Sequence, residues 1–196
     1  MPSRPRGLTA GDIQKLLAAL PDTPVGRRDR AIILVLTLTG RRRAEVLGLK
    51  AGDLVREGDC VYYSYRGKGG KAGKRELPQP ALRAIQTALS AFGQDLATMP
   101  PGASLWPSSA DHGRGITSGT FYGNLRRYFQ AAGLPPGGVH LFRHSAAKLR
   151  REAGQSVEEV SRFLDHSSLA VTSVYLRQLE GDRDTSWQRV AESIGL

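Results

Sequence analysis

Residues 117–194 form a succession of short segments with helical periodicity, and glycines separate several of them. Apolar residues that recur every three or four positions make one face of an α-helix, and glycine is common where a helix ends. A chain patterned in this way favours a fold in which helices dominate. The helices expected on this basis span residues 117–132, 140–153, 157–164, 170–176 and 185–194.

In the N-terminal half, the spacing of apolar residues and the residues that start or stop a helix predict further helices. Thr9 is a suitable N-cap for the first helix, and Pro21 stops it. Gly40 separates the second and third expected helices, and Pro80 fits the first turn of the fourth. The second, third and fourth helices are expected at residues 29–39, 42–49 and 81–92, with a loop at 99–115.

Residues 60–77 interrupt the helical pattern. Tyr62, Tyr63 and Tyr65 favour a strand, and several glycines follow before a second short strand near Glu76. We expect a β-hairpin whose long tip is rich in glycine and lysine. The predicted fold class is therefore mainly α with a small antiparallel β-sheet (α+β).

The composition limits the kinds of partner that the chain is expected to bind. Its 196 residues carry 28 Lys and Arg against 18 Asp and Glu, and a net charge of +10 attracts polyanions, nucleic acid before anionic membranes. The longest largely apolar run, residues 31–38, is far shorter than the roughly 20 residues that span a bilayer. Cys60 is the single cysteine, which excludes an intramolecular disulfide. The N-terminus shows no apolar signal core, so we expect a cytoplasmic protein with no membrane partner.

Three stretches combine phosphate-compatible side chains with a nucleophile. The first, residues 39–45, contains three consecutive arginines. The second, residues 140–144, reads His-Leu-Phe-Arg-His. The third, residues 164–168, reads Leu-Asp-His-Ser-Ser, and Tyr175 follows nine residues after His166. Residues of these kinds are suited to the cleavage of a phosphodiester by a tyrosine.

Attack on a phosphodiester needs positive charge around the phosphate and activation of the nucleophile. Guanidinium groups match the non-bridging oxygens with paired donors, and Arg42 and Arg143 supply them. The phenol of Tyr175 has an ordinary pKa of about 10, so it needs a base or a strong positive field to attack. His140 and the two arginines are the candidates for that role.

The oxygen that leaves a cleaved phosphodiester needs a proton from an acid held beside it. A lysine on the expected hairpin can give that proton. Lys68 is our first choice, and Lys71 and Lys74 are the rival acids. A glycine-rich loop with lysines is also typical of a hairpin that binds phosphate without sequence preference, so this alternative stays open.

At these residues the chain resembles the tyrosine recombinases, the family of phage integrases and chromosome-dimer resolvases. Four motifs carry the resemblance, in the family's order and with its spacing. They are Thr-Gly-x-Arg-x-x-Glu at residues 39–45, Gly-Lys-Gly at 67–69, His-x-x-Arg-His at 140–144, and Leu-x-His with a tyrosine nine residues after the histidine at 164–175. One such motif is weak evidence, whereas four together are specific. The resemblance extends from Leu8 to Tyr175.

The resemblance implies the tyrosine recombinase catalytic-domain fold and a site-specific recombinase or integrase that cuts and rejoins DNA. Tyr175 would form a 3′-phosphotyrosyl bond and release a 5′ hydroxyl, with no metal, ATP or other cofactor. In this scheme His166 donates a hydrogen bond to the phosphate. The residues implied as catalytic are Arg42, Lys68, His140, Arg143, His166 and Tyr175, with Glu45 and His144 in support.

The resemblance also implies partners and domains. The substrate is double-stranded DNA of the nucleoid, with no small-molecule substrate, and we expect a homotetramer on synapsed DNA and a monomer alone. A basic leader is expected at residues 1–8, the catalytic domain at 9–180 and a C-terminal helix at 181–196. That helix docks on its own domain or is exchanged between protomers. The N-terminal core-binding domain that usually precedes the catalytic domain is expected to be absent.

Two further features depart from the family pattern. Three consecutive arginines leave the first catalytic position ambiguous by one residue, and only the register set by residues 39 and 40 selects Arg42 over Arg41 or Arg43. Asp165 stands where the family usually has glycine. This substitution places a carboxylate near the expected phosphate site.

Several basic residues are candidates for contact with the DNA backbone, and the same residues would be ordinary solvated charges in a protein that does not bind DNA. Metal binding by His140 and His144 is disfavoured, because no glutamate completes the zinc-protease pattern. The rival functions are a type IB topoisomerase, which would relax DNA without recombination, and a DNA-binding regulator, which would form no covalent adduct. The DNA-binding candidates are Lys71, Lys74, Arg75, Arg126 and Arg127.

Overall fold

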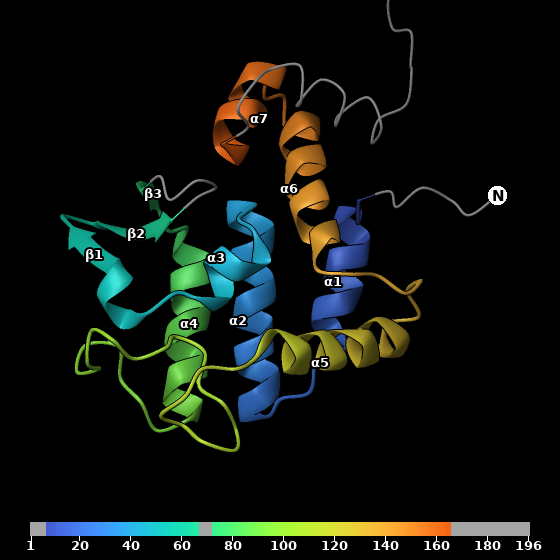
Figure 1. The fold of residues 1–196 in the computed structure, drawn as a ribbon. Coiled ribbons are helices and arrows are strands. Elements are labelled where there is room, and N and C mark those ends of the chain that lie inside the picture. The colour runs from blue at the N-terminus through green and yellow to red at the C-terminus, as the bar shows by residue number, and fades with distance from the viewer. Residues whose placement is uncertain (1–6, 67–71, 166–196) are drawn as a thin grey trace, which may run out of the picture.

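The computed structural model describes residues 7–66 and 72–165, which are drawn in colour in Figure 1. Several predictions concern positions outside these residues. They are the leader at 1–6, the helices at 170–176 and 185–194, the C-terminal segment 181–196, and the site residues Lys68, Lys71, His166 and Tyr175.

Helices dominate the described part of the chain, and the predicted fold class is confirmed (Figure 1). The helices are α1 (Ala10–Ala18), α2 (Pro24–Thr39), α3 (Arg43–Leu47), α4 (Gln79–Ala91), α5 (Ser118–Ala131), α6 (His140–Glu152) and α7 (Val157–Leu164). A short 3₁₀-helix at Ala51–Asp53 leads into an antiparallel sheet of β1 (Leu54–Glu57), β2 (Cys60–Arg66) and β3 (Ala72–Glu76). Within the described ranges, no helix has the length and apolar character needed to cross a membrane.

Local capping signals set the helix starts. Thr9 caps α1 as predicted, because its hydroxyl accepts a hydrogen bond from the Asp12 backbone N–H and the Asp12 carboxylate accepts one from the Thr9 N–H. α2 begins at Pro24, so the start expected at residue 29 is wrong. The reason is that the Thr23 hydroxyl accepts from the Gly26 N–H and Pro24 fits the first turn.

The sheet has three strands, one more than the predicted hairpin. β2 pairs with both neighbours, and Tyr63 lies opposite Leu54 of β1 and Arg75 of β3. β1 turns into β2 at Gly58, whose left-handed φ of 59° suits glycine. Residues 55–57 are all exposed, so no alternation of apolar and polar residues marks β1 in the sequence.

α2 is the central element of the core (Figure 1). Its side chains Ile33 and Leu36 are 0% and 1% exposed, and the helix packs against α4 and α6. The expected loop at residues 99–115 contributes the fully buried Trp106, whose indole N–H donates to the Val46 carbonyl over 2.6 Å. Burial of these side chains fixes where the C-terminal end of α2 lies.

α7 lies at that end of α2 and beside α6 (Figure 1). It packs on α6 through a small separate apolar cluster of Ala147, Val160 and Leu164. A Cβ added at Gly40 would lie 2.7 Å from the Phe163 ring, so the ends of α2 and α7 are in contact. The fold therefore brings the ends of α2 and α7 together with the start of α6, three segments that are far apart in the sequence.

Candidate active site

The turn that follows α2 places neighbouring arginines in different surroundings. Gly40 ends α2 in the left-handed region at a φ of 60°, and Arg42 is the N-cap of α3. The Arg41 side chain is 2% exposed, whereas that of Arg42 is 40% exposed, and Arg43 is exposed as well. Burial therefore argues against Arg41 as a ligand for DNA and leaves Arg42 open to one.

Glu45 holds Arg42 in place. One carboxylate oxygen of Glu45 accepts a hydrogen bond from the Arg42 backbone N–H over 3.0 Å, and the other accepts from the guanidinium Nη1 over 3.1 Å. The Glu45 side chain is only 7% exposed, so protein surrounds this carboxylate. A guanidinium has five N–H donors, and the contact with Glu45 uses one of them. Arg42 is thus both oriented and able to bind an oxyanion.

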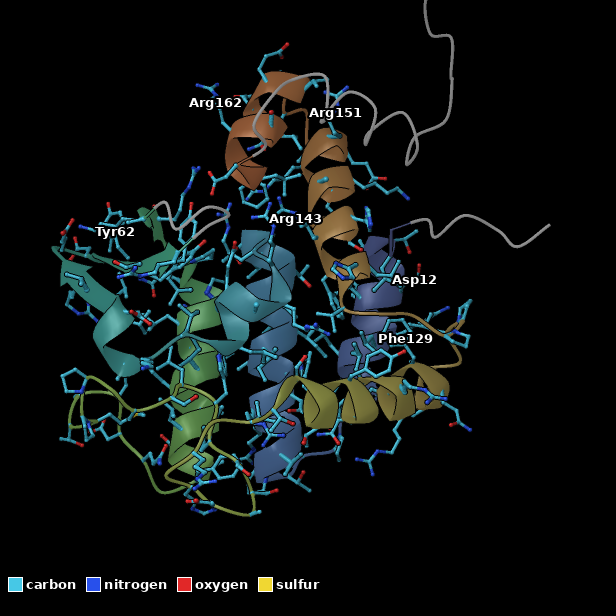
Figure 2. All side chains as sticks on the ribbon, viewed as in Figure 1. Asp12, Tyr62, Phe129, Arg143, Arg151 and Arg162 are labelled. Atoms are coloured by element: carbon cyan, nitrogen blue, oxygen red, sulfur yellow. The ribbon has the colours of Figure 1, made fainter. Side chains whose placement is uncertain are left out.

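Arg143 joins the ends of two helices. Its Nη1 donates to the Gly40 carbonyl over 2.7 Å, and its Nη2 donates to the Leu164 carbonyl over 2.6 Å. Those carbonyls lie at the C-terminal ends of α2 and α7, where the helix dipole favours a cation. Figure 2 shows Arg143 between α6 and the C-terminal end of α2, on the side of α7. One side chain therefore connects the three segments that carry the described motifs.

The two histidines of the predicted site lie one turn apart in α6. His140 is exposed. His144 is half-buried, and burial lowers the pKa of its imidazole, as do the neighbouring charges of His140 and Arg143. The segment before α1 lies beside this helix, where the Leu8 N–H donates to the Ser145 hydroxyl over 2.7 Å. Residues 7–66 and 72–165 hold no group of three His, Cys, Asp or Glu placed to bind a metal ion.

The carboxylate of Asp165 is enclosed by donors from three elements. It accepts hydrogen bonds from Arg41 after α2, from the Tyr65 hydroxyl on β2, and from Arg75 on β3 over 2.6 Å. The Cζ atom of Arg41 lies 4.4 Å from the centre of the Tyr65 ring, and the guanidinium also donates to the Phe163 carbonyl. We call Asp165, Arg41, Tyr65 and Arg75 the Asp165 cluster. The carboxylate that departs from the family pattern is therefore engaged by the protein's own cations.

Asp165 remains ionised in this cluster. Burial alone would raise the pKa of its carboxyl, but the hydrogen bonds from Tyr65 and Arg41 outweigh burial and lower the pKa to about 2. The residue caps α7 with a φ of 51°, and no other described non-glycine residue has a positive φ. Aspartate enters this left-handed region more readily than most residues, so it can occupy a conformation that glycine also favours, and it adds a charge.

The described DNA-binding candidates on the hairpin have partners within the protein. Lys74 pairs with Glu57 of β1, and its Nζ lies 4.9 Å from the centre of the Tyr62 ring. Because this ion pair is half exposed, a DNA phosphate can compete with Glu57 for the lysine. Arg75 is held more firmly, since it donates to the Arg162 carbonyl over 2.7 Å as well as to Asp165.

The two candidates on α5 lie away from the turn that carries Arg42. Asn124 of α5 donates to the Asp29 carboxylate over 2.7 Å, and Arg127 donates to Asn124. Asp29 precedes Gly40 by eleven residues on α2, which corresponds to about 16 Å along the helix. Arg126 and Arg127 are exposed there. A duplex that contacts both these arginines and the turn after α2 must therefore span a comparable distance.

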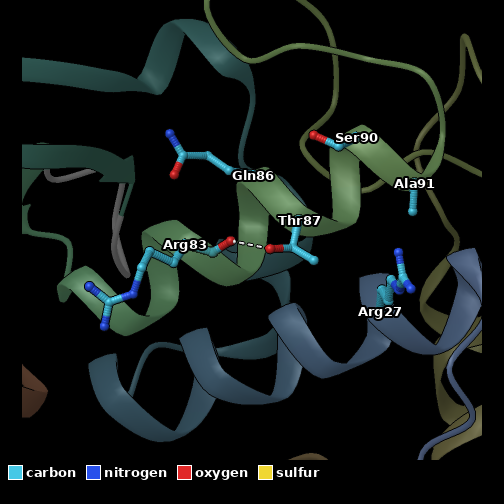
Figure 3. Close-up of a pocket in the computed structure, with 6 residues that line it drawn as sticks. All are labelled: Arg27, Arg83, Gln86, Thr87, Ser90 and Ala91. Atoms are coloured by element: carbon cyan, nitrogen blue, oxygen red, sulfur yellow. Dashed lines mark hydrogen bonds between the residues drawn. The ribbon is translucent and has the colours of Figure 1, made fainter.

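A hollow of about 480 Å³ opens between α2 and α4 (Figure 3). Arg27 in its wall pairs with Asp22 over 2.6 Å, and the Thr87 hydroxyl donates to the Arg83 carbonyl over 2.9 Å. None of its lining residues belongs to the four motifs, so the hollow is separate from the candidate active site. It is lined by Arg27, Arg83, Gln86, Thr87, Ser90 and Ala91.

The structure thus gathers part of the predicted site and adds residues that sequence reasoning missed. Arg42, Glu45 and Arg143 lie around the ends of α2 and α7, whereas the α5 arginines lie elsewhere. The additions are Tyr65 and the bond of Arg41 to Asp165, since the sequence offered Arg41 only as a rival to Arg42. The sequence hinted at this cluster only through the carboxylate of Asp165 in place of glycine. It did not name the partners of that carboxylate, because Arg41 and Tyr65 lie 124 and 100 residues away in the chain.

The model of the phage integrase family matches residues 6–181 of this chain. Tyrosine recombinase XerD of Mycobacterium leprae is 29% identical over 179 residues, which are 87% of this chain and 56% of that protein. Tyrosine recombinase XerA of Pyrococcus furiosus is 30% identical over 173 residues, which are 88% of this chain and 57% of that protein. The chain therefore spans somewhat more than half the length of these relatives.

Solved structures share the same arrangement. The XerH site-specific recombinase bound to its palindromic difH substrate in a post-cleavage complex is similar with a TM-score of 0.71 and 25% identity, covering 99% of this chain and 54% of that one. The XerA recombinase is similar with a TM-score of 0.72 and 22% identity, covering 100% of this chain and 66% of that one.

Proposed function

Because this chain belongs to the phage integrase family, we propose that it cuts and rejoins DNA strands through a covalent bond between Tyr175 and a backbone phosphate. Its described residues have the tyrosine recombinase catalytic-domain fold, as the likeness to the XerH and XerA recombinases shows. The observation that carries the proposal is the position of Arg143, because its two hydrogen bonds bring three motif-bearing segments to one place.

The proposed cleavage begins with attack of the Tyr175 hydroxyl oxygen on phosphorus. A bond forms between that oxygen and phosphorus, the bond from phosphorus to the 5′ oxygen breaks, and a 3′-phosphotyrosyl ester results. Arg42 and Arg143 stabilise the charge that accumulates on the non-bridging oxygens, and His166 donates a further hydrogen bond to them. His140 takes the phenol proton. The ordered contact of Arg42 with Glu45 supports this role, because a preorganised donor needs no rearrangement during the reaction.

The leaving 5′ oxygen takes a proton and becomes a hydroxyl, and we assign Lys68 as the acid that supplies it. The energy of the broken strand is retained in the phosphotyrosyl ester. A 5′ hydroxyl then attacks the ester, the phosphodiester forms again, and the Tyr175 oxygen recovers a proton. The positive charge and the proton transfers come from the chain's own side chains, so the proposed reaction uses no metal and no ATP.

We propose double-stranded DNA as the substrate and a homotetramer on synapsed DNA as the active assembly, with a monomer in its absence. Solved relatives support DNA as the substrate, since XerH was solved with its difH substrate and the Tn1549 transposon integrase with circular intermediate DNA. The net charge of +10 supports it as well. Residues 9–180 form the proposed catalytic domain, the helix at 181–196 is the proposed contact between protomers, and the proposed site of action is the nucleoid.

A nicked duplex tests the proposal, because the short strand that carries the 5′ hydroxyl diffuses away and traps the covalent intermediate. We expect a protein–DNA adduct that survives denaturation, and mass spectrometry of the DNA-linked peptide is expected to identify Tyr175. Tyr175→Phe, which removes only the attacking oxygen, should form no adduct and should still bind DNA. Tyr122, an exposed tyrosine on α5, is the matched control, and Tyr122→Phe should react normally.

Other outcomes would point to other functions. Specific DNA binding without any adduct would contradict the proposal and favour a regulator. Relaxation of supercoiled DNA by a monomer without recombination would favour a topoisomerase. Attachment at a residue other than Tyr175 would show that the motif spacing misleads.

A further inference from the structure

We propose that Asp165 is a positioning residue for strand cleavage, because its carboxylate holds both strands of the β2–β3 hairpin against the C-terminal end of α7. It thereby orients the two strands that flank the segment with the proposed acid, Lys68. The inference rests on the proposed function and concerns a position at which the chain departs from the family pattern.

The carboxylate ties the hairpin at two points. One oxygen of Asp165 accepts from Arg75 Nη2 of β3 over 2.6 Å, and the other accepts from the Tyr65 hydroxyl of β2. Arg75 also donates to the Arg162 carbonyl of α7 over 2.7 Å. Lys68 lies between these two strands in the chain, three residues after Tyr65. Each strand that flanks the lysine is therefore bonded to the end of α7.

The Tyr65 ring is fixed on both sides. Gly73 of β3 pairs with Tyr65, and a Cβ at Gly73 would lie 2.4 Å from the Tyr65 ring. Because glycine has no side chain, the ring can lie across β3 at this position. On the other side the Arg41 guanidinium stacks at 4.4 Å. A phenol held in this way directs its hydroxyl at Asp165 without freedom to swing aside.

Asp165 itself is anchored to the turn that carries the proposed phosphate ligand. Arg41, which is 2% exposed, bonds both the Asp165 carboxylate and the Phe163 carbonyl, and it is the residue before Arg42. A glycine in place of Asp165 could adopt the same left-handed backbone, but it would accept none of the three side-chain hydrogen bonds. The carboxylate therefore serves to join the hairpin, the Arg41 turn and α7.

Asp165→Asn is the test variant, because asparagine has the same size, also tolerates a positive φ, and lacks the charge. Cleavage is measured in single turnover on two nicked duplexes that differ in one atom. In the first, the bond from phosphorus to the 5′ oxygen breaks and this oxygen must take a proton. In the second, sulfur replaces that oxygen and the bond from phosphorus to sulfur breaks. The sulfur leaves as a thiolate without taking a proton, because a thiol, with a pKa of about 8.5 in cysteine, is far more acidic than an alcohol.

We expect Asp165→Asn to form the adduct about 10- to 100-fold more slowly than the unaltered chain on the oxygen duplex, because a misplaced acid loses much of its effect. On the sulfur duplex the two proteins should react at the same rate. Tyr65→Phe, which removes one hydrogen bond and keeps the ring, should show a smaller loss with the same recovery on sulfur. If Asp165→Asn fails to fold, Tyr65→Phe tests the proposal in its place.

Asp22→Asn is the matched control. It makes the same change from carboxylate to amide at a residue that precedes α2 and pairs with a surface arginine, Arg27. Its rate should equal that of the unaltered chain on both duplexes. Equal slowing of this control and of Asp165→Asn would overturn the proposal.

The proposal would also be wrong if Asp165→Asn cleaved the oxygen duplex at the normal rate. Slowing by the same factor on both duplexes would overturn it too, because a general disturbance of the fold does not depend on the leaving atom. Failure of the proposed function would give a different result, because the unaltered chain would then form no adduct on either duplex. In that case the positioning role of Asp165 would be wrong as well.

Discussion

Gly40 fixes the turn that leads to Arg42 in three ways. Its φ of 60° favours glycine, and a Cβ at this position would lie 2.7 Å from the Phe163 ring. Its carbonyl also accepts a hydrogen bond from Arg143. A single glycine therefore sets the backbone of the turn, the approach of α7 and the acceptor for an active-site arginine.

Gly40→Ala should destabilise the protein by more than the backbone conformation alone requires. A left-handed alanine costs about 1–2 kcal/mol, and the clash with Phe163 should add about 1–3 kcal/mol. Gly133→Ala is the control, because Gly133 has a φ of 65° with open space around it. Urea unfolding measures both variants, and equal losses would show that contact with α7 does not matter.

Arg143→Lys should slow cleavage strongly and change DNA affinity little. A lysine ammonium is one point of charge and cannot bond two carbonyls while it presents a planar fork to a phosphate. We expect about a 10²- to 10³-fold lower rate of adduct formation, as for loss of an oxyanion donor. Arg30→Lys, which alters an arginine that bonds the Leu17 carbonyl, should leave the rate unchanged. A normal rate in Arg143→Lys would refute the assigned role.

His144 should make stability depend on pH below neutrality. Burial, with help from His140 and Arg143, holds the pKa of the folded imidazole below its ordinary 6.5, so the fold favours the neutral form. The stabilisation is complete above pH 6.5 and is lost as the pH falls below that value. The unfolding free energy in urea should therefore fall between pH 7 and pH 5, and less so in His144→Gln. His112→Gln, at an exposed histidine, should behave like the unaltered chain.

At the scale of elements, a buried polar network joins α2 to α5 and to the long loop before α5. Asp29 is fully buried, and it accepts hydrogen bonds from Arg28, Asn124 and Tyr128 over 2.9, 2.7 and 2.9 Å. Arg28, 1% exposed, also donates to the Pro107 carbonyl over 2.9 Å. Burial and the Asp29 charge raise the pKa of the Tyr128 hydroxyl. The network holds the N-terminal part of α2 in one place.

Asp29→Asn should cost about 3–5 kcal/mol of unfolding free energy, because it leaves the buried Arg28 guanidinium without a negative partner. Chemical denaturation measures the loss. Asp22→Asn is the matched control, since Asp22 pairs with Arg27 at the surface near the start of the same helix, and no measurable loss is expected there. If both variants lost little stability, the buried pair would not be what holds α2 against α5.

At the scale of the whole molecule, the net charge of +10 and the two groups of basic residues govern encounter with DNA. One group lies on the hairpin and around the ends of α2 and α7, and the other lies on α5 near the N-terminal part of α2. The core between them is continuous through α2. The buried helix α2 therefore connects the two groups, and a duplex that contacts both must span the distance between them.

DNA affinity should therefore fall steeply with salt, and Arg126→Gln should make the slope shallower by about 0.9 in a plot of log affinity against log salt concentration, as expected for one lost phosphate contact. Fluorescence anisotropy with a labelled duplex measures the slope. Arg27→Gln, at an arginine paired with Asp22, should leave the slope unchanged. An unchanged slope in Arg126→Gln would place α5 outside the DNA interface.

The sequence alone determined the features that depend on near neighbours. The helix starts at Thr9, Thr117 and Ser156 follow from hydrogen bonds that span three residues. The motifs that predict the site are also local, and they placed Arg42 and Glu45 three residues apart on one turn, where the structure shows their contact. These parts could be predicted because each interaction joins residues that are only a few positions apart in the chain.

Only the tertiary structure decided the features that depend on distant partners. β1 forms because β2 offers it hydrogen bonds, and its own exposed residues gave no pattern. The burial of Arg41, its bond to Asp165 and the bridge that Arg143 makes between α2 and α7 join residues 103 and 124 positions apart in the chain. Whether such charges meet depends on where packing of the core brings the helix ends, and no local pattern contains that information.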